Sequence, residues 1–187
     1  TGLCVGAGSV VGLLAFFVGA IPRAVIAPIL VFIGFEIVHQ AYRESPPQHS
    51  PAVSFAFLPV IASLVMIILG QFTGAAGILP EQLPPHLKTM HASLLMLANG
   101  FIVTGLLWGS LLAFVIDQKP TQAACCAACC GVLTLFGIIH SILPSGALYL
   151  PWRIDPGPHL SVAAAYLVLA AVLLIVKRSP RGKGGAS

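Results

Sequence analysis

Apolar residues along the chain are grouped into six long windows, separated by short stretches rich in proline and charged residues. Within each window the residues are continuously apolar, without the alternation that a lipid-facing strand requires. A helix needs about 20 mainly apolar residues to cross a bilayer. The pattern therefore predicts an all-α polytopic membrane protein with six transmembrane helices, over residues Leu3–Ala20, Ile21–Tyr42, Ala52–Phe72, Thr89–Ile116, Thr121–Leu143 and His159–Val176.

The first two windows touch in the stretch VGAIPRA, which contains Pro22. A proline ring carries no amide hydrogen and breaks a helix. A single helix over both windows would greatly exceed the hydrocarbon thickness. We therefore expect a tight helical hairpin at Pro22.

Composition and charge placement support a membrane protein. Hydrophobic residues make up 58% of the chain and charged residues 7%, whereas a soluble domain is roughly a quarter charged. The formal net charge of +4 would fit a nucleic-acid partner in a soluble chain, but the positive-inside rule explains its placement better. With both termini cytoplasmic, the inner side holds Arg43, Lys119, Lys177, Arg178, Arg181 and Lys183, and the outer side holds Arg23, Lys88 and Arg153. The partner expected is the lipid bilayer, with anionic lipid near the basic tail, and no nucleic acid.

Glu36 and His39 stand three residues apart near the end of the second window, in VFIGFEIVHQAY. At this spacing they share one helix face, and a rise of about 1.5 Å per residue from the outer side places both near the inner headgroups. Two interpretations stay open. The pair makes interfacial hydrogen bonds, or it takes part in gating or proton handling, since histidine titrates near neutrality. A di-iron site is not expected, because it needs further glutamates and a second Glu-x-x-His pair.

His91 opens the fourth window and His140 closes the fifth, so both are expected near the outer surface. The same two interpretations stay open for this second pair. Bilayer depth separates it from Glu36 and His39, so the four residues are not expected to form one site. Asn99 is the clearest polar residue expected near mid-membrane, where it ties two helices together.

Four cysteines lie in one short run, at Cys125, Cys126, Cys129 and Cys130. On a helix they occupy two adjacent stripes, so their sulfurs cannot converge on one metal ion, and a disulfide between helix neighbours has poor geometry. Reduced, buried cysteine behaves as a small apolar residue. We expect a packing role, with metal binding or redox sensing as the alternative.

No triad order, zinc-protease motif, phosphate loop or dinucleotide fingerprint is present in the sequence,. We therefore expect no enzyme activity, no catalytic residue, no metal and no cofactor. A membrane redox enzyme that uses the cysteine run or the histidines is the alternative.

The start of the chain resembles a known family. TGL at Thr1–Leu3, a small-residue helix, and FFVGAIPRAVIAPILVFIGFEI at Phe16–Ile37 resemble nucleobase permeases of the azaguanine and hypoxanthine–guanine–adenine type, within the nucleobase–ascorbate transporter class. In that family a Gly-Gly-Arg-Thr-Gly-Leu stretch precedes the eleventh helix, and an Ile-Pro turn begins the twelfth. GIIHSILPSGALYLPW at Gly137–Trp152 also resembles bacterial permease-like proteins.

The resemblance implies a transporter of two inverted repeats with seven helices each, in a bacterial inner membrane. Residues 1–20 would be the last helix of the core domain, and residues 21–187 a gate domain with additional C-terminal helices and a basic cytoplasmic tail. The family's substrate-binding glutamate lies upstream of the eleventh helix and has no counterpart here. Four helices also follow the hairpin, where the family has two. The chain, which does not begin with Met, is therefore expected to be a C-terminal fragment.

The function implied is secondary transport of a purine-like or other small organic solute by alternating access. The partners are then the solute with a coupling cation, and a second copy of the chain in a homodimer. Glu36 and His39 would influence closure of the gate rather than hold substrate. The alternative is a structural or assembly membrane protein that does not transport.

Overall fold

A computed structural model describes residues 23–153 and 157–178 of the chain, and these residues form helices joined by turns, without a strand. The chain divides into two compact units, Thr1–Pro46 and Pro47–Ser187. In the first unit the described element is α3 (Arg23–Glu44). The second unit contains the α-helices α4 (Ser50–Ala56), α5 (Leu58–Ala76), α6 (Pro85–Ala98), α7 (Phe101–Ile116), α8 (Pro120–Leu135) and α9 (Pro158–Arg178), with the 3₁₀ turns η1 (Pro47–His49), η2 (Pro80–Gln82) and η3 (Pro151–Arg153).

Two helical stretches of the described residues are long and apolar enough to cross a membrane. They are Pro47–Ala76, which joins η1, α4 and α5, and Pro158–Lys177 in α9. The pair α6 and α7 makes a third if its two helices are one bent span. The sequence prediction is thus confirmed in its coarser form, as an all-helical chain with two or three candidate spans. The first window, the expected Pro22 hairpin and the domain boundary at residues 20 and 21 lie outside the described residues.

Large apolar side chains cover the outside of these helices. Among the most exposed are Phe72 in α5, Ile102 in α7 and Ile175 in α9, at 72%, 71% and 66% of their full accessible surface. A soluble monomer rarely exposes large contiguous apolar surface. These helix faces therefore have the character of surfaces that lipid covers.

Proline marks the start of each described α-helix of the second unit except α7. Pro51, Pro59, Pro85 and Pro120 each occupy one of the first two positions of a helix, and Pro158 is the first residue of α9. A first-turn amide has no partner within its helix, so proline loses nothing there, and its fixed φ suits the helix.

The fourth window does not form the single helix that its apolar pattern predicted. It is divided into α6 and α7, which meet at an angle of 76°. Asn99 has extended backbone angles, and Gly100 has φ +72°, in the left-handed region. Glycine reaches this region without the steric cost of a Cβ atom, and a helix cannot continue through it.

The fifth window is also shorter than predicted, because α8 ends at Leu135 rather than continuing to Leu143. Gly137 has φ +69°, and its amide donates to the carbonyl of Thr134. The amide of Ile138 donates to the carbonyl of Leu133. These two bonds form a Schellman motif, which closes a helix at a left-handed residue. His140 therefore lies in a non-helical segment and does not close a helix as predicted.

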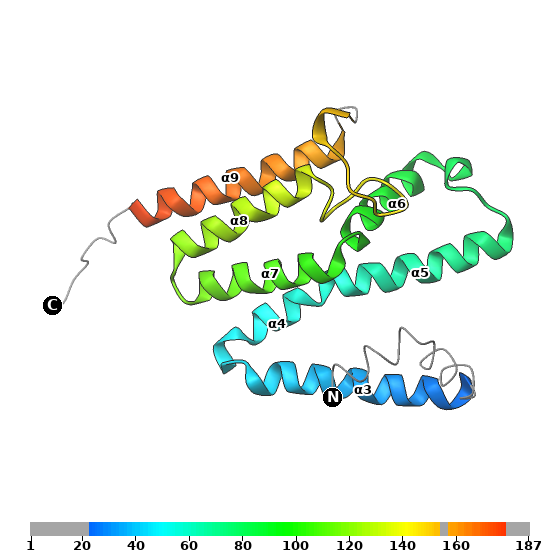
Figure 1. The fold of residues 1–187 in the computed structure, drawn as a ribbon, viewed down its shortest axis with the longest axis horizontal. Coiled ribbons are helices and arrows are strands. Elements are labelled where there is room, and N and C mark those ends of the chain that lie inside the picture. The colour runs from blue at the N-terminus through cyan, green and yellow to red at the C-terminus, as the bar shows by residue number, and fades with distance from the viewer. Residues whose placement is uncertain (1–22, 154–156, 179–187) are drawn as a thin grey trace, which may run out of the picture. The chain divides into compact units, whose positions relative to one another are not determined.

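Small residues bring the helices of the second unit close together. In Figure 1, α8 and α9 run side by side in opposite directions. At their contact, a Cβ atom on Gly131 would lie 3.3 Å from the carbonyl oxygen of Ala163, closer than an ordinary contact. Ala123, Ala124, Ala127 and Cys130 are buried in α8. In α7, a Cβ on Gly105 would lie 2.7 Å from the carbonyl oxygen of Ala56 in α4. In lipid, close backbone approach of this kind replaces the hydrophobic drive as the source of helix association.

Asp117 joins the turn after α7 to the segment before α4. Its two carboxylate oxygens lie 2.7 Å from Nε2 of His49 and 3.0 Å from Nζ of Lys119. The hydrogen bond from His49, then that from Lys119, lowers the pKa of Asp117 below its ordinary value of 3.8. Folding therefore favours the ionised carboxylate.

Replacing Gly100 by alanine should destabilise the fold. An alanine would be held at positive φ, with its Cβ 2.9 Å from Cα of Ile139 and closer still to the carbonyl oxygen of Ile138. Strain of this kind costs about 1–3 kcal/mol, so the thermal unfolding midpoint in detergent should fall. Gly70→Ala in α5 is the control, because nothing lies within 4 Å of the added Cβ and alanine favours a helix. Equal effects of the two substitutions would contradict the constraint at Gly100.

Asp117 should contribute stability that depends on pH in one direction. Because its pKa is lower in the folded than in the unfolded protein, the contribution is present above the ordinary value of 3.8 and is lost as the pH falls through the folded-state pKa,. Asp117→Asn should therefore be less stable than the wild type near neutral pH, with a difference that shrinks in acid below that value. Thermal unfolding across this pH range measures it. Glu81→Gln, at an exposed carboxylate in η2, should leave the profile unchanged.

Candidate functional site at the helix break

Two non-helical segments meet in the second unit, the break at Asn99–Gly100 and the segment that follows α8. The side-chain amide of Asn99 donates to the carbonyls of Ser141, at 2.8 Å, and Leu143, at 2.9 Å. The backbone of Gly100 lies against that of Ile138 and Ile139. The break is therefore held by a loop that is about 40 residues distant in sequence, and an asparagine side chain makes the connection.

His140 replaces the hydrogen bonds that the break removes. In a continuous helix the carbonyl of Met96 would accept from the amide of Gly100, and that of Asn99 from the amide of Val103. Here the main-chain amide of His140 donates to the carbonyl of Asn99 at 3.1 Å. Its ring nitrogen Nδ1 lies 3.2 Å from the carbonyl oxygen of Met96. One residue thus satisfies two carbonyls at the break.

His140 is buried and has an unusual backbone conformation. Its exposed fraction is 4%, and its φ is +55°. A non-glycine residue in the left-handed region costs free energy, and such residues gather at functional sites. The backbone contacts at the break hold it there.

Tyr166 of α9 and Trp108 of α7 extend the hydrogen bonds of His140 across the second unit. The hydroxyl of Tyr166 lies 2.8 Å from Nε2 of His140, and Nε1 of Trp108 donates to the same hydroxyl at 2.6 Å. The rings of His140 and Tyr166 stack with centroids 5.8 Å apart, and Trp108 stacks on Phe55 of α4. The chain of bonds therefore connects α6, α7, α9 and the segment after α8.

The hydrogen bonds of this network are consistent with one assignment of donors and acceptors. A carbonyl only accepts, so Nδ1 of His140 carries the proton that is donated to Met96. In the neutral ring Nε2 then accepts from the hydroxyl of Tyr166, and this hydroxyl oxygen accepts from Trp108. Protonation of His140 would make Nε2 a donor and reverse the bond to Tyr166. The arrangement can therefore register the gain or loss of one proton in a buried position.

His159 is a second buried histidine, with an exposed fraction of 0%. Its ring meets that of Tyr149 edge to face, with centroids 5.4 Å apart. Neither ring nitrogen has a hydrogen-bond partner among the described residues. Of these two histidines, only His140 belongs to a hydrogen-bonded network, so it is the better candidate for a functional group.

Comparison of this chain with family models, curated proteins and solved structures finds no match. The resemblance of its first part to nucleobase permeases therefore stays a prediction. The Thr1–Leu3 motif and the Ile21-Pro22 turn that carry much of it lie outside the described residues.

The structure brings together two of the five polar residues selected from the sequence. Asn99 and His140 share the break, while His91 is half-buried in α6. Among the described residues, no hydrogen bond or ring contact joins His91 to His140. Asn99 ties α6 to a loop rather than to another helix. The sequence pairing of the two histidines stays a hypothesis.

Glu36 and His39 lie in the first unit, both exposed on α3. Oε1 of Glu36 accepts a hydrogen bond from the side-chain amide of Gln40 at 3.4 Å. Gln40 was not among the polar residues selected from the sequence, although residues four apart are neighbours on a helix. The described residues contain no ion pair between Glu36 and His39.

The cysteine run lies on α8, and the packing role expected for it is seen within the described residues only for Cys126 and Cys130. Cys130 is buried, Cys126 is half-buried, and Cys125 and Cys129 are exposed. The thiol of Cys126 donates to the carbonyl of Leu107 in α7 at 3.3 Å. In the described part of the chain no group of three or more His, Cys, Asp or Glu side chains is placed to hold a metal ion.

Sequence reasoning missed Trp108 and Tyr166, which carry most of the polar network. Both lie within windows that were assigned to apolar spans. A signal was available, because a buried tryptophan N–H or tyrosine O–H usually finds a hydrogen-bond partner. An aromatic residue with a polar atom inside a span is therefore a candidate for such a network.

Tyr166→Phe should destabilise the second unit. The substitution keeps the ring but removes the hydroxyl, so Nε1 of Trp108 and Nε2 of His140 both lose their partner. A buried polar group left without a partner costs about 1–3 kcal/mol, and the thermal unfolding midpoint should fall accordingly. Trp152→Phe, which removes the polar atom of an aromatic side chain that is 73% exposed in η3, is the control and should leave the midpoint unchanged. A midpoint that Tyr166→Phe leaves unchanged would rule out the network as a stabilising feature.

Proposed function

We propose that this chain is part of a membrane permease that moves a purine-like or other small organic solute by alternating access. The observation that carries the proposal is the helix pair α6 and α7, bent by 76° at Asn99–Gly100, next to a second non-helical segment. Transporters commonly place their binding and coupling sites at discontinuous helices, where freed backbone groups face a polar ligand. Irregular backbone at membrane depth is tolerated where protein or a water-filled cavity surrounds it.

His140 is the proposed coupling group, with a proton as the coupling cation. Its ring is joined to Tyr166 and through it to Trp108, so its protonation changes hydrogen bonds on α9 and α7 together. These helices would then shift relative to one another when the proton is gained or lost. A hydrogen-bonded pair that can reverse its direction is a suitable two-state element for such a step.

The proposed orientation places both termini in the cytoplasm of a bacterium, in its inner membrane. Lys119 and Lys177 line the same pocket, next to the end of α9, whereas Arg153 precedes the start of α9. The positive-inside rule then favours the end with Lys119 and Lys177 as the inner one. Glu36 and His39 remain gate candidates near the inner mouth.

Uptake of labelled purines tests the proposal. Cells that express the complete gene product containing this chain should accumulate label above cells with an empty vector. Because His140 is the proposed coupling group, His140→Gln should abolish the pH dependence of uptake and lower its rate, with the protein still present in the membrane. His86→Gln, at an exposed histidine of α6, should transport as the wild type does.

Failure to take up any base or other small solute of a tested panel would overturn the permease proposal. It would favour the structural or assembly protein instead. Uptake with an unchanged pH profile in His140→Gln would keep the permease and remove the coupling role of His140.

A further inference from the structure

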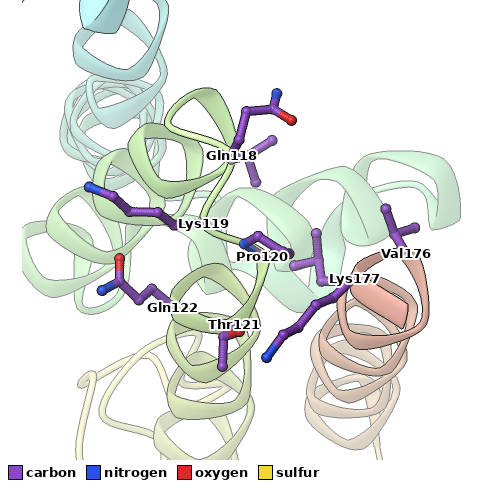
Figure 2. Close-up of a pocket in the computed structure, with 9 residues that line it drawn as sticks. Gln118, Lys119, Pro120, Thr121, Gln122, Val176 and Lys177 are labelled. Carbon is purple, nitrogen blue, oxygen red and sulfur yellow. The ribbon is translucent and has the colours of Figure 1, made fainter. Parts of the chain in front are cut away.

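A pocket of about 720 Å³ lies where α7, α8 and α9 come together at one end of the second unit. Its volume is in the range of known small-molecule sites, about 300–1,000 Å³. The turn between α7 and α8 provides one side of the pocket, and the last turns of α9 provide the other (Figure 2). It does not overlap the site at the helix break, because none of its lining residues belongs to that network.

The pocket has an apolar and a polar part. Val115 from α7, with Leu173 and Val176 from α9, supplies branched apolar side chains. Lys177 supplies an ammonium group, whereas that of Lys119 is bonded to Asp117. Thr121 and Gln122 supply hydrogen-bonding side chains. In Figure 2 the side chain of Lys177 extends from the end of α9 toward the start of α8. A ligand that fits both parts is amphipathic, with an anionic head.

The charge balance around the pocket is positive. The one carboxylate in the adjoining turn, Asp117, is already bonded to His49 and Lys119. Among the described residues no carboxylate pairs with Lys177.

The position of Lys177 fixes the level of the pocket in a bilayer. It is the last residue of the candidate span Pro158–Lys177, and charged residues at helix ends extend toward the headgroups. If α9 crosses the membrane, the mouth of the pocket lies at the headgroup level, and its apolar part lies at the start of the acyl region. Free phosphate would use only the polar part.

We infer that this pocket binds an anionic phospholipid, with the phosphate near Lys177 and Thr121 and the upper acyl chain against Val115, Leu173 and Val176. Charge complementarity and the apolar lining together select this occupant over a zwitterionic lipid or a free anion. The inference does not depend on transport, since it requires only that α9 crosses the membrane.

Lipid-dependent stability of the purified protein tests the inference. Dioleoylphosphatidylglycerol, dioleoylphosphatidylcholine and inorganic phosphate are each titrated into the protein in detergent, and the thermal unfolding midpoint is followed. Dioleoylphosphatidylglycerol should raise the unfolding midpoint to a plateau as its concentration increases. Dioleoylphosphatidylcholine and inorganic phosphate should not raise it at the same concentrations. Lys177→Gln should raise the half-saturating concentration of dioleoylphosphatidylglycerol about fivefold, as expected for one lysine near anionic headgroups.

Two further variants keep the result interpretable. Lys177→Arg retains the charge and should bind as the wild type does. Lys88→Gln removes the same charge from an exposed lysine in α6 outside the pocket, and it should leave the half-saturating concentration unchanged. Equal effects of Lys177→Gln and Lys88→Gln, equal stabilisation by the two lipids, or stabilisation by inorganic phosphate alone would each overturn the inference.

Discussion

The hydrogen bonds that His140 makes to the broken helix are the interaction on which the centre of the second unit depends. A backbone carbonyl that is buried without a hydrogen-bond partner costs free energy, so a carbonyl freed from a helix needs another donor. The break at Asn99–Gly100 frees the carbonyls of Met96 and Asn99, and His140 provides a donor to each. Gly100 permits the close approach that these bonds require, because any side chain there would meet the backbone of Ile138 and Ile139. The break and the segment after α8 therefore form one unit of structure.

The same histidine links this backbone arrangement to the packing of the helices. Its left-handed backbone conformation directs its main chain to Asn99 while its ring reaches Tyr166 in α9. Trp108 completes the connection to α7, and the small residues of α7 and α8 allow the helices to approach closely enough for these bonds to form. Polar side chains in such a network are satisfied by one another, which removes the cost of burying them. The proposed coupling role follows from this arrangement, because the proton on one ring affects bonds on several helices.

The two ends of the second unit differ in chemistry. The turn between α7 and α8 contains Asp117 and Lys119, with Lys177 beside it at the end of α9. His49, from before α4, is bonded to Asp117. At the start of α9 the loop after α8 is mostly apolar, and Trp152 is 73% exposed, as suits an interfacial aromatic residue. A membrane protein with this distribution has one face suited to anionic headgroups and another suited to aromatic anchoring. The proposed lipid site and the proposed orientation are both consistent with this asymmetry.

The sequence by itself determined that the chain is helical and where most of its described helices lie, because continuous apolar runs and prolines are local signals. The last window illustrates this, since the prediction His159–Val176 differs from α9 (Pro158–Arg178) only at its ends. Gly100 and Gly137 were also visible, but whether a glycine in an apolar run adopts positive φ depends on what packs against it. The polar network was decided by tertiary structure alone, since Trp108, His140 and Tyr166 meet only after three separate segments have folded together. Hydropathy measures the preference of a single residue for an apolar or an aqueous environment, whereas a hydrogen bond requires a partner at a particular distance and direction.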